Sequence, residues 1–263
     1  MFDRVLTAAA WLVVLFILGP LVVIIGGSFT TTPFVAFPPH GFTLHWYQQL
    51  LGRSDFLRSF GDSVLLGAAA TAGAALVGIP TVLGLRHGSA RSRLFLNGLV
   101  MAPLTLPTIV TGIALLQFYY TIDLELPLVG LLAGHVLITI PYFVRTVGAG
   151  LESFDPCIEE AAGSLGAGFF RTLFRVTLPG IAPSIFAAMI FVFITSFGQV
   201  TISVFLSTPG FMPLPIRIYN YVEFAIDPML AAVSTLLILL AFALVAGLQR
   251  LIGLERAFGG GVS

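Results

Sequence analysis

The chain has 263 residues, of which 57% are hydrophobic and only 9% are charged, and its mean hydropathy is +1.03. This composition is typical of a membrane protein. The formal net charge is zero, which argues against a nucleic-acid partner. All 12 basic residues are arginine, so the chain lacks the lysine of a Walker A loop and cannot be a P-loop ATPase.

Long uncharged runs predict about six membrane-spanning helices, because a bilayer core of about 30 Å needs roughly 20 apolar helical residues. The first run exceeds the roughly 7–15 apolar residues of a signal peptide, so we expect a true span. The third contains Pro103 and Pro107 and predicts one long or kinked helix. The fifth ends at the turn signal Pro209-Gly210. The predicted spans lie near residues 5–27, 60–85, 95–120, 127–145, 181–206 and 229–250.

The distribution of arginine predicts that both termini are cytoplasmic, since cytoplasmic loops carry an excess of basic residues. We expect a first helix and periplasmic segment over 1–58, a transmembrane domain over 59–250 with an inside loop at about 145–180, and a cytoplasmic tail over 251–263. In this topology Arg4, Arg86, Arg91, Arg93, Arg145, Arg171, Arg175, Arg250 and Arg256 lie inside, and Arg53, Arg58 and Arg217 lie outside.

Only His135 is an ionisable residue deep within a predicted span. It is either a neutral imidazole bonded to a neighbouring helix or part of a proton relay. The first interpretation is favoured, because the spans contain no carboxylate to share the proton. The sequence also lacks the motifs of intramembrane or metal-dependent hydrolases, so we expect neither an enzyme nor an ion-driven pump.

The inside loop carries signals for two short helices. Asp155-Pro156 predicts an N-cap with proline at the first helical position. Glu159 and Glu160 follow in the first turns, near the positive end of the helix dipole, and Gly166 predicts the helix end. A second helix is expected from about Phe169 to Thr177, with Pro179 holding Leu178 out of helical geometry.

The second helix has an aromatic and a cationic stripe, since Phe170 and Phe174 are four residues apart, as are Arg171 and Arg175. Such a helix suits a groove on another protein or the surface of anionic lipid, and the residues alone leave both open. The single cysteine, Cys157, lies in the same loop and is expected to be an inert small residue, because no cation adjoins it.

The loop resembles the EAA loop of ABC importer permeases of the MetI-like fold. Glu160-Ala161-Ala162, Gly166 and Val176-Thr177-Leu178-Pro179 match its spacing, with Val176 where isoleucine is usual. The resemblance extends over roughly residues 59–250 and is closest to the spermidine/putrescine branch. Further matching stretches are Phe42–Tyr47, Pro103–Pro107, Gly112–Leu116, Leu214-Pro215, Ile218–Asn220 and Ser234–Ile238.

The resemblance implies an inner-membrane, multi-pass subunit that binds no cofactor itself. It implies two ATP-binding subunits carrying ATP and Mg, a second homologous permease chain and a periplasmic binding protein as partners. The loop would form coupling helices seated on an ATP-binding subunit, with Glu160 as the polar contact and Gly166 as the turn. The candidate coupling residues are Glu159, Glu160, Ala161, Ala162, Gly166, Phe170, Arg171, Phe174 and Pro179.

The candidate translocation path consists of Gln117 near the outer end of the third span and a stripe of Thr195, Gln199 and Ser203 on the fifth. These residues either line the path or bond between helices. The outer segment 213–227 either meets the binding protein or anchors at the interface.

The resemblance implies a polyamine or related polar solute as substrate. Gly198-Gln199 stand where the polyamine branch usually has acidic residues, which keeps iron, thiamine and phosphonate compounds open. A non-transporting scaffold or channel subunit is the alternative from another class.

Overall fold

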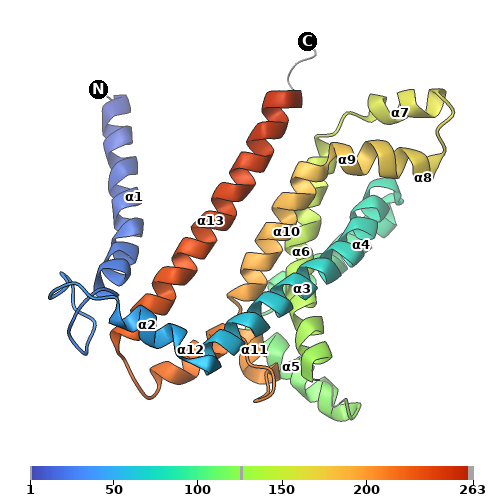
Figure 1. The fold of residues 1–263 in the computed structure, drawn as a ribbon. Helices are drawn as coiled ribbons and strands as arrows, with labels where there is room; N and C mark the ends of the chain where they lie inside the picture. The colour runs from blue at the N-terminus through green and yellow to red at the C-terminus, as the bar shows by residue number, and fades with distance from the viewer. Residues whose placement is uncertain (1, 125–126, 260–263) are drawn as a thin grey trace. The chain divides into compact units, whose positions relative to one another are not determined.

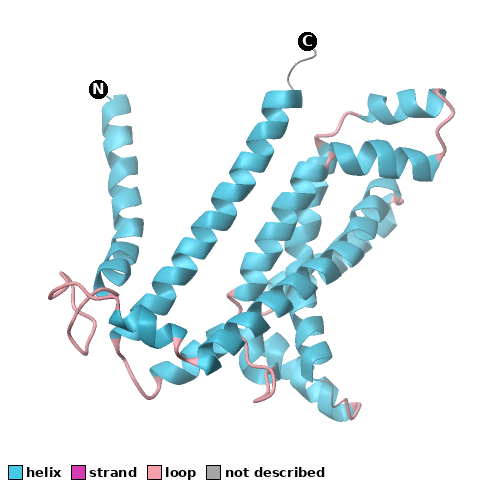
Figure 2. Cartoon of the chain, in the orientation of Figure 1, coloured by secondary structure: helices cyan, strands magenta, loops and turns pink. Residues whose placement is uncertain are grey.

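The computed structural model describes residues 2–124 and 127–259, which are mostly helical (Figures 1 and 2). Within these ranges the β-type pairing is an isolated bridge between Thr208 and Phe211. The elements are α1 Phe2–Gly27, α2 His45–Leu51, α3 Ser54–His87, α4 Ala90–Thr105, α5 Thr108–Thr121, α6 Pro127–Glu152, α7 Pro156–Ser164, α8 Phe169–Thr172, the π-helical turn η1 Leu173–Thr177, α9 Leu178–Gly180, α10 Ala182–Phe197, α11 Thr201–Leu206, α12 Leu214–Val222 and α13 Pro228–Gly259.

The chain divides into two compact units. Unit 1 comprises the chain through Phe60 together with Arg217–Ala243, and unit 2 comprises Gly61–Ile216 and the chain from Leu244. Four helices are long and apolar enough to span a bilayer, namely α1, α3, α6 and the first part of α13. Two bent helix pairs raise the number to six if each pair is one span. The expectation of about six spans is therefore confirmed if each bent pair is counted as one span.

In unit 1, hydrogen bonds join the start of the loop between α1 and α2, residues 28–44, to side chains of α2. The Ser28 and Tyr47 hydroxyls are 2.6 Å apart, and Trp46 Nε1 donates to the Thr30 carbonyl at 2.7 Å. Towards α13, the Tyr221 hydroxyl donates to Asp227 at 2.6 Å. Burial, followed by this hydrogen bond, raises the pKa of Tyr221 to about 12. The segment 213–227, which the sequence predicts to be outer, contains the helix α12, and the bond between Tyr221 and Asp227 links this helix to the start of α13.

The core of unit 2 lies where α3, α6 and α10 meet, and α6 runs beside α10 (Figure 1). Phe143 and Val192 are fully buried there. A close approach between α3 and α6 depends on Gly78, because a Cβ at this position would overlap with the Phe143 ring. Small residues permit such close packing between helices in membranes. A second cluster joins α3, α6 and α11 through Leu66, Leu131, Ile138, Ile202 and Leu206.

The third predicted span is not one kinked helix. α4 and α5 meet at an angle of 102°, which makes the pair either a broken span or a re-entrant loop. The break falls at Leu106, whose φ of −94° and ψ of 139° are extended. Pro107 explains it, because a proline disfavours helical geometry in the residue before it.

The fifth predicted span, 181–206, is also two helices. α10 ends at Phe197, Gly198 follows as its C-cap, and α11 starts only at Thr201. The fourth span continues to Glu152, seven residues beyond the predicted end at Arg145, so the following segment starts later than expected. Arg145 is compatible with this longer helix because its side chain is exposed rather than packed in the core.

The prediction that Pro179 ends the second loop helix was wrong. Leu178 is helical, with φ −62° and ψ −44°, and the backbone passes from α8 through η1 into α9. A π-helical turn displaces the carbonyl with which the proline ring would otherwise clash. α13 continues helically through Gly259, into the predicted tail 251–263, and residues 260–263 of that tail lie outside the described residues.

Candidate functional site

The segment from Asp155 to Gly180, here called the α7–α9 segment, contains the residues that the sequence singled out. Figure 1 shows α7 and α8 as two short helices beyond the N-terminal end of α10. The predicted start of α7 is confirmed, because an Asp155 carboxylate oxygen accepts from the Cys157 N–H at 2.9 Å and Pro156 occupies the first turn. The cap and the proline fix where the helix starts.

The predicted end of α7 is also confirmed. Gly166 has a φ of +81°, in the left-handed region that favours glycine. The N–H of Ala167 donates to the Ala162 carbonyl at 3.0 Å, and the N–H of Gly166 donates to the Gly163 carbonyl at 2.9 Å. These bonds satisfy carbonyls at the helix end and turn the chain back towards α8.

Glu159 has a role that the sequence did not reveal. Its two carboxylate oxygens accept from Arg86 at 3.0 and 2.8 Å, and one of them also accepts from the Thr177 hydroxyl at 2.6 Å. We call these three residues the Glu159 brace. It ties α7 both to the end of α3 and to η1. Its partners lie 73 and 18 residues away in the chain, so no local pattern could have identified them.

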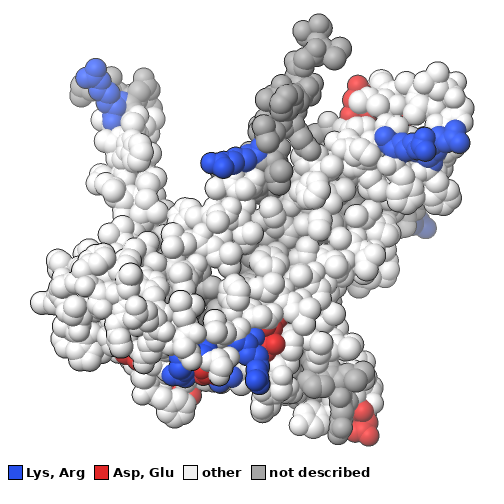
Figure 3. Space-filling view, viewed as in Figure 1, with Lys and Arg blue, Asp and Glu red and all other residues white. Residues whose placement is uncertain are grey.

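Glu160, by contrast, is exposed, as are Ala161 and Pro179, while Ala162 is half-buried. Arg171 and Arg175 are exposed too, and the side chains of Phe170 and Phe174 are 72% and 64% exposed. Figure 3 shows charged side chains around α7 and α8. Large exposed aromatic side chains beside charges are typical of a surface that contacts a protein or a membrane.

Cys157 is exposed on α7. Its hydrogen bond to Asp155, and then the negative charges of Asp155 and Glu160, raise the pKa of its thiol. Because the thiolate is the reactive form, the environment disfavours reaction near neutral pH. This agrees with the expectation of an inert residue.

The three residues of the predicted stripe, Thr195, Gln199 and Ser203, do not lie on one helix. Ser203 is fully buried, Thr195 and Gln199 are half-buried, and Gln117 is exposed on α5. Gln199 lies in the break between α10 and α11 rather than on a helix. The expected four-residue periodicity across the fifth span is therefore interrupted.

Ser203 instead bonds to His135, which is fully buried on α6. His135 Nε2 lies 3.0 Å from the Ser203 oxygen and Nδ1 lies 2.8 Å from the Ser196 oxygen. The Ser203 hydroxyl donates to the Gln199 carbonyl at 2.8 Å, so it accepts from Nε2–H, and in a neutral imidazole Nδ1 then accepts from the Ser196 hydroxyl. His135 thus links α6 to both sides of the break, which agrees with the favoured interpretation of an imidazole bonded to a neighbouring helix.

Residues 74–254 match the protein family described as "binding-protein-dependent transport system inner membrane component". The match covers more than half of the chain. The chain belongs to this family of importer permeases. The permease is therefore a multi-pass inner-membrane transport subunit and not an enzyme, and its family works with a binding protein. The scaffold and channel alternatives are excluded.

Curated relatives align with the permease over most of its length. It is 30% identical over 242 residues to the spermidine/putrescine transport system permease protein PotC of Shigella flexneri, covering 92% of this chain and 91% of the relative. It is 28% identical over 241 residues to the putrescine transport system permease protein PotI of Escherichia coli strain K12, covering 87% and 85%.

Solved structures confirm the fold of the permease. A chain from a bacterial ABC transporter involved in the import of the acidic polysaccharide alginate aligns with a TM-score of 0.75 at 17% identity, over 95% of both chains. A chain of the methionine ABC transporter MetNI in an inward-facing conformation aligns with a TM-score of 0.62 at 18% identity, over 75% of this chain and 94% of that one.

Proposed function

We propose that the permease forms half of the translocation pathway of an ATP-driven importer and that the α7–α9 segment is its contact with an ATP-binding subunit. One observation carries the proposal. Glu160, Phe170 and Phe174 are exposed on this segment, in which a cap and a left-handed glycine define the ends of α7 and the Glu159 brace ties α7 to α3. A docking element that transmits force needs both an exposed face and a rigid attachment.

In this proposal each of these residues makes a different contribution to docking. Glu160 makes the polar contact, Ala161 and Ala162 allow close approach, and Gly166 permits the turn. Phe170 and Phe174 fill the apolar part of the groove on the partner, while Arg171 pairs with its acidic rim. Pro179 starts the return towards α10. Glu159 makes no contact with the partner; its bonds to Arg86 and Thr177 hold the docking surface in place.

The complete importer would contain two ATP-binding subunits, which carry ATP and Mg, and a second permease chain homologous to this one. The excess of arginine on one side of the predicted topology supports a cytoplasmic location for the α7–α9 segment. Closure of the ATP-binding subunits on ATP would move this segment, and the brace would carry the movement into α3.

The docking role is tested by co-purification of the ATP-binding subunit with permease variants. Glu160→Lys reverses the charge of the contact, and Gly166→Val forces a β-branched residue into left-handed geometry. Both should abolish association while the permease still inserts. Glu223→Lys, a charge reversal at another exposed glutamate, in unit 1, is the matched control and should retain association. Normal co-purification with both test variants would contradict the proposal and favour a segment that lies on lipid.

We further propose that the transported solute is a polyamine. The support is the similarity to the PotC and PotI proteins, which are named for spermidine and putrescine transport and align over most of their length. Gln199 in the break between α10 and α11 is neutral, so recognition of the cation would rest largely on the binding protein. Mass spectrometry of the ligand that co-purifies with the cognate binding protein tests this point. Iron, thiamine or a phosphonate in its place would refute the polyamine assignment and leave the importer role intact.

A further inference from the structure

The α1–α2 loop, residues 28–44, has its large apolar side chains on the outside and polar groups on the inside. The hydroxyl-bearing residues Ser28 and Thr30 are fully buried. Large exposed apolar patches mark contacts with a protein, a ligand or a membrane. The exposed apolar side chains of the loop are Phe34 at 59%, Val35 at 41%, Phe37 at 49%, Phe42 at 75% and Leu44 at 57%.

The loop is an ordered structure that satisfies much of its own hydrogen bonding. The Thr43 N–H donates to the Phe29 carbonyl at 2.9 Å, and the Thr31 N–H donates to the His40 carbonyl at 3.2 Å. The rings of Phe29 and Phe42 are stacked with their centroids 4.6 Å apart. Backbone groups that are paired within the loop cost less to transfer out of water. The apolar side chains are thus presented on a fixed scaffold.

The position of the loop in the chain places it at the surface of the bilayer. α1 is an apolar span of 26 residues, which corresponds to about 39 Å of helix. A bilayer is about 40–45 Å thick including its headgroups, so a spanning α1 ends in the interfacial region. The loop starts at the next residue, Ser28, and the bond from Trp46 to the Thr30 carbonyl keeps α2 close to this end.

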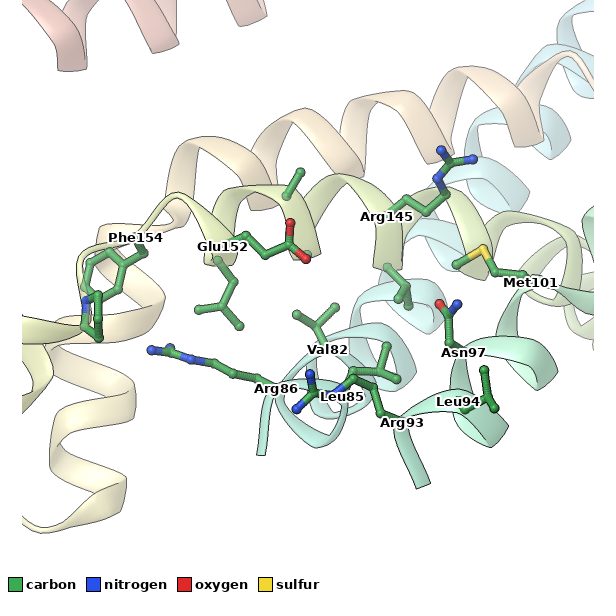
Figure 4. Close-up of a pocket in the computed structure, with 15 residues that line it drawn as sticks. Val82, Leu85, Arg86, Arg93, Leu94, Asn97, Met101, Arg145, Glu152 and Phe154 are labelled. Carbon is green, nitrogen blue, oxygen red and sulfur yellow. The ribbon is translucent and has the colours of Figure 1, made fainter. Parts of the chain in front are cut away.

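The loop carries no charge that would need to stay in water, because the sequence has no Asp, Glu, Lys or Arg between Arg4 and Arg53. The cavity between α3, α4 and α6 is different, since Arg86, Arg93 and Arg145 line it (Figure 4). Protein interfaces usually have a polar rim around their apolar centre. An uncharged apolar surface that continues directly from a span fits lipid better than it fits a protein partner.

We propose that the α1–α2 loop inserts into the bilayer boundary at the C-terminal end of α1, between the headgroups and the acyl chains, and anchors α1 there. Phe34, Phe42 and Leu44 contact the acyl chains, and burial of their apolar surface drives the insertion. Aromatic side chains are enriched at this level of a membrane. Because the loop is uncharged, its insertion does not depend on the charge of the lipid. The proposal is independent of the docking role of the α7–α9 segment.

The test is spin labelling of the Phe34→Cys and Leu44→Cys variants in a Cys157→Ser background, with the importer assembled from cysteine-free partner subunits in nanodiscs. Power saturation compares collisions with oxygen, which concentrates among acyl chains, and with a nickel chelate, which stays in water. The ratio of oxygen to chelate collisions should be higher at both positions than in the control Glu223→Cys, an exposed charged position of unit 1. It should be the same in phosphatidylcholine and in phosphatidylglycerol.

Four results would overturn the proposal. Equal ratios at positions 34, 44 and 223 would place the loop in water. Protection of positions 34 and 44 from both reagents would mean that the second permease chain covers the loop. Protection that appears only with loaded binding protein would assign the loop to that protein. A ratio that falls when phosphatidylcholine replaces phosphatidylglycerol would indicate recognition of headgroup charge. Phe34 and Leu44 lie outside the Phe29–Phe42 stack, so the labels leave it intact.

Discussion

Glu159 and Glu160 are adjacent in the chain, yet the structure gives them opposite environments. The Glu159 carboxylate bonds to Arg86 and Thr177 and is 22% exposed, whereas Glu160 is exposed. Charge-assisted, bidentate bonds of this kind are stronger than the exposed ion pairs of most surfaces. The two carboxylates should therefore respond differently to the same substitution.

Glu159→Gln should loosen the α7–α9 segment, because it removes the ion pair with Arg86. We expect a local loss of about 1–2 kcal/mol, measured as faster hydrogen exchange of the amides of residues 157–177 in lipid nanodiscs. Glu160→Gln is the control and should leave this exchange unchanged. Equal exchange in the two variants would mean that the brace does not hold the segment.

Cys157 provides a direct probe of the same surface. Its thiol pKa lies above the ordinary value of 9.0, chiefly because of the hydrogen bond to Asp155. Since only the thiolate reacts, alkylation by iodoacetamide should be slow at pH 7 and rise about tenfold per pH unit up to pH 9. Asp155→Asn removes the charge but can still cap α7, so it should lower the pKa and speed the reaction at pH 7. An unchanged rate would show that Asp155 does not control the thiol.

At the scale of elements, the close approach of α3 and α6 is set by one glycine. Gly78→Ala would place a Cβ against the buried Phe143, so we expect a loss of about 1–3 kcal/mol from overpacking. Gly84→Ala, on the same helix, has no atom within 4 Å of the added Cβ and should be neutral or slightly stabilising. Thermal unfolding of the detergent-solubilised permease distinguishes the two. Equal unfolding temperatures of the two variants would refute the close packing of Gly78 against Phe143.

The break between α10 and α11 is held by His135, which bonds Ser196 and Ser203 on its two sides. His135→Ala leaves both hydroxyls without this partner and opens a cavity, so we expect a loss of about 2–4 kcal/mol. In a double-mutant cycle, His135→Ala with Ser203→Ala should cost less than the sum of the single changes. Strict additivity, measured by thermal unfolding, would mean that the two side chains are not coupled.

Local signals predicted some elements well and others poorly, for physical reasons. The Asp155-Pro156 start and Gly166 end of α7 depend on neighbouring residues, and both were predicted correctly. The extension of α6 past Arg145 depends on the exposure of that side chain in the fold, and the π-helical turn before Pro179 contacts α7, where Glu159 accepts from Thr177. Neither can be read from the residues around it. The Glu159 brace joins residues 73 positions apart and was missed for the same reason.

For the whole molecule, the alternation of apolar runs and arginine-bearing loops was enough to predict a membrane protein with about six spans. The 102° bend between α4 and α5 was predicted only as a kink, because the hydrophobic run continues through it, whereas the 67° bend lies at the predicted start of the fifth span. Thr195, Gln199 and Ser203 were placed on one helical stripe because the hydrophobic run also continues through the break between α10 and α11. The family assignment rests on the loop motif and on the extended sequence match, not on periodicity.

The central claim is that the α7–α9 segment couples ATP hydrolysis on the partner subunits to uptake of the solute by the permease. The most direct test is accumulation of labelled spermidine by proteoliposomes that contain the complete importer, loaded binding protein and ATP on the side of the ATP-binding subunits. The account predicts uptake that requires ATP and binding protein and is lost with Glu160→Lys. Uptake at the wild-type rate with Glu160→Lys, or without ATP, would contradict it.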